Sequence, residues 1–352
     1  MRNTHRRRLS PKRDTVNEGD VRMHMADALI SPAVGGTMLV ATGATAVYCA
    51  KKIKEDLDQS KIPLMGVLGA FIFAAQMVNF TIPGTGSSGH LGGGMILAVL
   101  LGPYAAFLVM ASVLGVQALF FADGGLLALG ANVFNLGFFP AFVAYPLIYK
   151  RIVGNNPSRN RLVAGAIAAV VVGLSLGAFG VVLETTASSI SELPFGTFAA
   201  AMMPIHLAIG IVEGLVTAGV ILFVKSARPE LLARVSAGRP LGGLDLKPVL
   251  IGLLTAAVIA GGALSWFASS NPDGLEWSIA GVTGVEEIEG AGSGVHEAST
   301  ALQEKTAFMP DYGTGTAAST STAGIVGGGI TLVMAALIGF ALKRRRGAGA
   351  TR

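Results

Sequence analysis

Nine long apolar segments limit this chain to folds that a membrane can hold. They cover residues 33–50, 63–80, 90–101, 103–121, 130–149, 162–183, 197–224, 248–268 and 324–342. Most reach the roughly 17 to 25 residues that a membrane-spanning helix needs. Because 52% of the 352 residues are apolar and only 13% are charged, we expect an all-α polytopic membrane protein rather than a soluble domain with one anchor.

The loops between these segments alternate in charge. One set is rich in Lys and Arg and covers residues 51–61, 150–161, 225–247 and 343–346. The other set has a single basic residue, Lys305, and covers residues 81–89, 122–129, 184–196 and 269–323. If every segment crosses, the positive-inside rule places the basic set and the C-terminus in the cytoplasm and the other set outside. Since the net charge of +5 is spread between apolar segments, we do not expect a nucleic-acid partner.

The stretch from Thr81 to Gly94, TIPGTGSSGHLGGG, is a run of turn formers with one histidine, His90. Only twelve residues, His90 to Leu101, come before the breaker pair Gly102-Pro103, and a helix of that length covers roughly 18 Å of a hydrocarbon core of about 30 Å. One interpretation is therefore a functional histidine at membrane depth, on irregular backbone that lines a cavity. The alternative is an interfacial loop whose histidine touches lipid headgroups.

The N-terminal tail conflicts with an outside location. Residues 1–22 carry seven Lys or Arg against three acids, and translocated tails normally avoid such a bias. We therefore expect the functional chain to begin at Met23. A chain that begins Met23-His24 offers an amine, a peptide nitrogen and an imidazole to one cation, and a second histidine completes a four-nitrogen square. Such tetragonal sites suit nickel, copper and, less strictly, cobalt.

Four motifs resemble those of the CbiM/NikM family, the substrate-capture components of energy-coupling factor (ECF) transporters for cobalt and nickel. They are MHMADALISPAVGG from Met23, AAQMVNFTIPGTGSSGHLGGG from Ala74, GANVFNLG from Gly130 and HLAIGIVEGLVTA from His206. The resemblance runs from Met23 to about Lys225. The remaining part, with PDGLE at Pro272 to Glu276, is similar to the auxiliary CbiN or NikN component. Family members typically begin at the Met-His pair, so the 22-residue extension is the main departure.

The resemblance implies specific roles for residues of this chain. It implies Met23, His24 and His90 as metal donors, and the residues expected to support the loop are Asn79, Ser87, Ser88, Asn132 and Asn135. His206 and Glu213 lie seven residues apart on one helix face, where they either form an ion path or are a buried pair satisfied by neighbouring helices, the interpretation that we favour. Glu184 and Glu192 are expected to be solvated outside.

These observations predict four regions. Residues 1–22 form a basic extension, 23–225 the metal-binding S component of seven helices, 226–247 a cytoplasmic linker, and 248–346 a PDGLE-like segment of two transmembrane helices. The external loop at 269–323 is expected to be mobile and of low complexity, with a turn at Asn271 to Trp277.

The predicted function is capture of Co²⁺ or Ni²⁺ for ATP-driven uptake across a prokaryotic cytoplasmic membrane. The sequence contains no GxxxxGK[ST] motif, so the resemblance implies CbiO/NikO-like ATPases and a CbiQ/NikQ-like coupling protein as partners, besides membrane lipid. No cofactor and no enzymatic activity are expected, and the choice between nickel and cobalt stays open. The rivals are a self-sufficient secondary carrier or channel and a membrane metalloenzyme, although no HExxH pair is present.

Overall fold

The computed structural model describes residues 24–56, 58–155, 157–286, 288, 294–314 and 316–347. The predicted basic extension and Met23 lie outside them. The first half contains η1 (Asp27–Leu29), α1 (Pro32–Asp56), α2 (Lys61–Gln76), β1 (Phe80–Ile82), β2 (Ser87–Gly89), α3 (Gly94–Leu101), α4 (Pro103–Phe121), α5 (Leu129–Val133) and η2 (Phe134–Tyr149). The second half contains α6 (Lys150–Val153), α7 (Arg159–Ser188), α8 (Phe195–Ala227), α9 (Pro229–Ser236), α10 (Lys247–Gly262), η3 (Leu264–Phe267), α11 (Gly274–Thr283), α12 (Gly294–Thr306), η4 (Pro310–Tyr312) and α13 (Ala317–Gly347).

Each predicted apolar segment forms a helix, so the expectation of a helical membrane protein is confirmed. Six helical stretches in the described part of the chain are long and apolar enough to cross a membrane, namely Pro32–Ile53, Pro103–Phe121, Leu129–Val153, Arg159–Ser188, Phe195–Ala227 and Ala317–Lys343. The apolar helices α2 and α10 are shorter, at 16 residues each, and α3 has only eight. The count of seven helices plus two that cross the membrane therefore stays a prediction.

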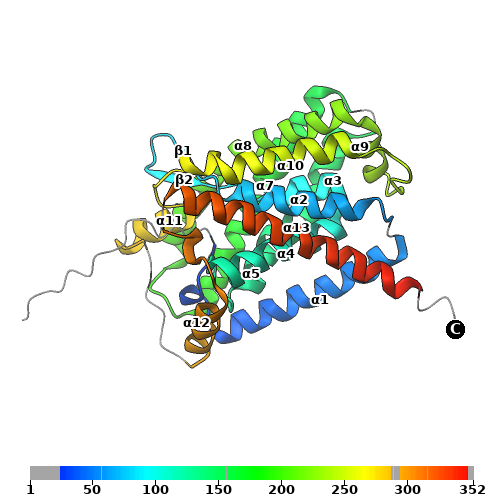
Figure 1. Cartoon of the computed structure of the whole chain (residues 1–352). Helices are drawn as coiled ribbons and strands as arrows, with labels where there is room; N and C mark the ends of the chain where they lie inside the picture. The colour runs from blue at the N-terminus through cyan, green and yellow to red at the C-terminus, as the bar shows by residue number, and fades with distance from the viewer. Residues whose placement is uncertain are drawn as a thin grey trace, which may run out of the picture.

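The helices α2, α3 and α4 form the interior of the bundle. Every residue of α3 is buried, as is nearly all of α2. The C-terminal helices α10 and α13 pack along α2 and shield it (Figure 1). Small residues make this close contact possible, because a Cβ on Gly324 of α13 would lie within 2.7 Å of backbone atoms of Gly261 of α10.

On the other side of the bundle, α7 packs against α8 and against the π-helix η2. η2 contains Pro140 and Pro146, which cannot donate a backbone hydrogen bond and which disturb the regular α-helical pattern. Pro140 lies against the first residue of α3, where a Cβ on Gly94 would approach its ring to 2.8 Å. Only glycine fits at this crossing, which fixes α3 beside η2.

The hairpin β1–β2 and the helices α11 and α12 gather at one end of the bundle, whereas α9 and the C-terminal end of α13 lie at the opposite end (Figure 1). Two predictions need correction here. The short third helix begins at Gly94 rather than at His90, because the preceding residues form the hairpin and an extended segment. The predicted mobile loop at 269–323 contains α11, α12, η4 and the start of α13, since its buried side chains pack against the bundle.

The α10–α13 crossing gives a stability prediction. Gly324→Leu should lower the free energy of unfolding by about 1 to 3 kcal/mol, because backbone on the facing helix leaves no room for the new side chain. Gly329→Leu is the matched control on the same helix, since a Cβ there meets nothing within 4 Å. Thermal unfolding in detergent measures both, and equal midpoints for the two variants would contradict the close crossing.

Candidate metal centre

The glycine-rich segment from Thr81 to Gly94 is an antiparallel hairpin followed by extended backbone. Phe80 pairs with Gly89 and Ile82 pairs with Ser87, and the turn between the strands has Gly84 and Gly86 at positive φ. His90 follows β2 directly, and Gly93 at φ 77° then starts the turn into α3. His90 is thus held between a hairpin and a helix start rather than within a helix.

Glu213 of α8 fixes the backbone just after His90. Its two carboxylate oxygens accept hydrogen bonds from the Gly92 amide at 3.0 Å and the Gly93 amide at 2.8 Å. The Gln76 side chain donates to the Gly92 carbonyl at 3.0 Å. Because these groups are buried, each unsatisfied amide would be costly, so Glu213 is an anchor of the segment.

His206 of α8 lies at the edge of a small cavity inside the bundle. Its Nδ1 donates to the Met202 carbonyl of its own helix at 2.8 Å. Both His206 and Glu213 line the cavity, yet the contacts of Glu213 run to the glycine-rich segment. Their predicted part in an ion path therefore stays a prediction.

The structure brings His24 and His90 together, although 65 residues separate them in the sequence. Their ring centroids lie 5.3 Å apart with a tilt of 58°. His90 Nδ1 donates to the Leu91 carbonyl at 3.2 Å, so Nε2 carries the lone pair. His24 Nε2 donates to Gln117 Oε1 at 3.0 Å, which leaves the lone pair of that ring on Nδ1.

Asp273 also reaches this site, and the sequence did not single it out. Its Oδ2 lies 4.0 Å from His90 Nε2, while its Oδ1 accepts from the Leu275 and Glu276 amides at 2.8 and 2.9 Å at the start of α11. The Glu276 side chain completes a capping box, a pattern that Asp followed by Glu three residues later signals. Burial raises the pKa of the Asp273 carboxyl to about 7, against the opposing effect of these amides and of His24.

The hairpin serines bind the same C-terminal segment. The Ser88 amide donates to the Pro272 carbonyl at 2.8 Å and the Ser88 hydroxyl to the Asn271 carbonyl at 2.8 Å, while the Ser87 hydroxyl lies 3.4 Å from the Pro272 carbonyl. The Asn79 carbonyl accepts from the Ser269 amide at 2.8 Å. These predicted loop residues therefore join the loop to the PDGLE segment.

The two asparagines of the GANVFNLG motif have other partners than the predicted loop. Asn132 exchanges two hydrogen bonds with the Met25 backbone, at 3.2 and 3.1 Å, and so holds the residue next to His24. Asn135 donates to Glu184 at 2.9 Å. The prediction of a solvated Glu184 is wrong, because the residue is only 8% exposed where α7 packs against η2.

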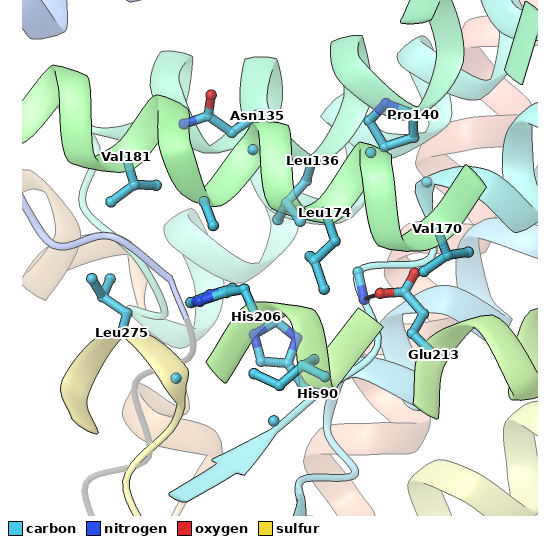
Figure 2. A pocket seen from close by; sticks show the side chains of 18 of the residues that line it. His90, Asn135, Leu136, Pro140, Val170, Leu174, Val181, His206, Glu213 and Leu275 are labelled. Carbon is cyan, nitrogen blue, oxygen red and sulfur yellow. Dashed lines mark hydrogen bonds between the residues drawn. The ribbon is translucent and has the colours of Figure 1, made fainter. Parts of the chain in front are cut away.

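This cavity, of about 90 Å³, lies among these groups and is lined by His24, His90, Asn132, His206, Glu213 and Asp273. Figure 2 shows His90, His206 and Glu213 around it. A second pocket of about 460 Å³ shares His24 and Leu275 with it. Within the described residues, no group of three or more His, Cys, Asp or Glu side chains is arranged to hold a metal ion.

Comparisons with known proteins identify related transport proteins. Residues 24–231 match the family model CbiM, the cobalt uptake substrate-specific transmembrane region, and residues 247–344 match the PDGLE domain. A protein of Archaeoglobus fulgidus that carries the name fused nickel transport protein NikMN is 35% identical over 333 residues, 92% of this chain and 98% of that protein. The cobalt transport protein CbiM of Sorangium cellulosum is 30% identical over 62% of this chain and 97% of its own length.

The fold is also similar to a solved one. The crystal structure of a transition metal transporter matches with a TM-score of 0.52 and 31% sequence identity, over 61% of this chain and 98% of that one. The chain belongs to the CbiM family of transport proteins and is the multi-pass membrane component of a cobalt or nickel uptake transporter, with a PDGLE domain at its C-terminal end.

Proposed function

We propose that this chain captures Ni²⁺ or Co²⁺ with four nitrogens, which are the Met23 amine, the His24 peptide nitrogen, His24 Nδ1 and His90 Nε2. The observation that carries the proposal is the meeting of His24 and His90, with ring centroids 5.3 Å apart, at the cavity. Chelation by amine, adjacent peptide nitrogen and Nδ1 closes a five-membered and a six-membered ring. Four nitrogens in a plane suit these ions.

In the proposed site, the supporting residues hold different parts of the chain. Asn132 holds the backbone of the N-terminal donor segment, while Glu213 and Gln76 hold the backbone that presents His90. Asn79, Ser87 and Ser88 join the hairpin to the C-terminal segment. Asn135 acts farther from the donors, through Glu184.

We further propose that Met23, the hairpin and residues 269–323 face the outside of a prokaryotic cytoplasmic membrane. Two observations support this orientation. The hairpin, α11 and α12 share one end of the bundle, whereas the basic loop that contains α9 and the C-terminal end of α13 lie at the other end (Figure 1). In this arrangement residues 23–225 form a seven-helix S component, 226–247 a cytoplasmic linker, and 248–346 add two further crossings.

In the proposed system, energy comes from CbiO/NikO-like ATPases through a CbiQ/NikQ-like coupling protein, as membership of the CbiM family implies. The chain itself binds the ion and presents it to these partners. Purified chain alone, reconstituted in lipid vesicles, should then show no metal flux. Flux without the ATPases would instead indicate a secondary carrier or channel.

The loop histidine gives the first binding prediction. His90→Ala should weaken Ni²⁺ and Co²⁺ binding by roughly 100-fold or more, because it removes one of four donors. His206→Gln, a change at another histidine of the same cavity, should leave the affinity within a factor of about three. Isothermal titration calorimetry on both variants measures the difference, and an unchanged affinity in His90→Ala would refute the donor set.

The free amine gives the second prediction. A chain that begins at Met23 should bind the metal tightly, whereas the same chain with residues 1–22 retained or with an acetylated Met23 amine should not, since the amine can no longer coordinate. Acetylation changes no side chain, so the thermal unfolding midpoint of the metal-free protein should stay the same. Equal nickel affinity in the acetylated and free forms would exclude the amine as a donor.

A further inference from the structure

A chain of buried hydrogen bonds leads from His24 into the C-terminal segment. His24 Nε2 meets Gln117 Oε1 at 3.0 Å, Gln117 Nε2 meets the Tyr312 hydroxyl at 3.2 Å, and that hydroxyl meets Asp123 Oδ2 at 2.5 Å. All four residues are at most 6% exposed. Gln117 belongs to α4 and Asp123 to the turn after it, whereas Tyr312 comes from η4 in the PDGLE segment.

The chemistry of these groups fixes which group donates and which accepts in each of these hydrogen bonds. A carboxylate only accepts, so the Tyr312 hydroxyl donates to Asp123 and its oxygen accepts from the Gln117 amide nitrogen. Burial and the Asp123 charge raise the pKa of the Tyr312 phenol, which keeps its proton for this bond. The amide oxygen of Gln117 then faces His24 and can only accept.

This order of donors and acceptors decides the tautomer of His24. With Gln117 Oε1 as the acceptor, Nε2 carries the proton and Nδ1 carries the lone pair. Nδ1 is also the ring nitrogen that can close a six-membered chelate with the His24 peptide nitrogen, because Nε2 points away from the backbone. The opposite tautomer would place a proton at the position of the metal.

The surroundings hold Tyr312 firmly in this position. Its ring stacks on Phe121 with centroids 5.2 Å apart and meets the edge of Phe73 at 6.2 Å. Its backbone lies at φ 61° and that of Asp311 at φ 49°, a left-handed conformation that bulky residues rarely adopt. Such backbone persists only where neighbouring contacts hold it, and it often marks functional positions.

We propose that Tyr312 is a positioning residue for metal capture, which orients Gln117 and thereby keeps His24 in the tautomer that presents Nδ1 to the ion. The inference rests on the proposed function in one respect, which is that His24 is a metal donor. On this proposal, a residue of the PDGLE segment helps to prepare the metal site. The outer groups of metal sites commonly fix the tautomer of a ligating histidine in this way.

Tyr312→Phe tests the proposal, because it removes the hydroxyl and keeps the ring that packs on Phe121. Released from Tyr312, the Gln117 amide can turn, so His24 should become a mixture of both tautomers and Ni²⁺ affinity should fall by about 10- to 100-fold. Long-range ¹H–¹⁵N spectra of the metal-free, histidine-labelled full chain report the tautomer, and His24→Gln assigns the signal. Titration of the form that begins at Met23 with Ni²⁺ gives the affinity.

Tyr145→Phe is the matched control, since Tyr145 is about as buried, at 4% exposure against 5% for Tyr312, and takes no part in the series of hydrogen bonds. It should change neither the His24 tautomer nor the nickel affinity. An Nε2-protonated His24 in Tyr312→Phe, whatever the affinity, would overturn the proposal. Retained nickel affinity in His24→Gln would instead refute the proposed donor set, and the metal-free spectra separate the two failures.

Discussion

The proposed site depends on how the bundle provides hydrogen-bond partners for a short piece of irregular backbone in its interior. The amides of Gly92 and Gly93 are buried where neither helix nor strand provides partners, and the Glu213 carboxylate accepts both. A buried carboxylate and two buried amides would each be costly alone, but together they satisfy one another. The position of His90, two residues earlier, follows from this contact.

A second consequence is that the C-terminal segment packs over the proposed metal site. Asp273 caps α11 beside His90, and the hairpin serines bind the carbonyls of Asn271 and Pro272. Helix α2 is also buried by the C-terminal segment, because α10 and α13 pack along it where glycines allow a close approach. The CbiM-like and PDGLE-like parts of this chain therefore share one core and one site.

The sequence predicted the helices well, and it also pointed to residues that the structure brings together at the proposed site. Apolar segments identified the long helices of the bundle because hydropathy is a local property. His90 stood out because histidines are rare in apolar surroundings, and the Met-His pair stood out because it follows a basic tail and offers neighbouring nitrogen donors. The loop at 269–323 was misread as mobile, since its polar composition conceals helices that are held by packing against α4, α8, β2 and the N-terminal segment. Glu184 was misplaced for a similar reason, because nothing nearby in the sequence reveals its contact with Asn135.

By itself, the sequence determined the helical membrane class, the glycine-rich break that carries His90 and the identity of the two histidines. Only the tertiary structure decided which groups surround them. Gly92 lies 121 residues from Glu213, and Gln117 lies 195 residues from Tyr312, so no local pattern links these pairs. Hydropathy and helix periodicity act over one or two turns, whereas the tautomer and position of a metal-binding histidine depend on partners that only the packed bundle brings within hydrogen-bonding distance.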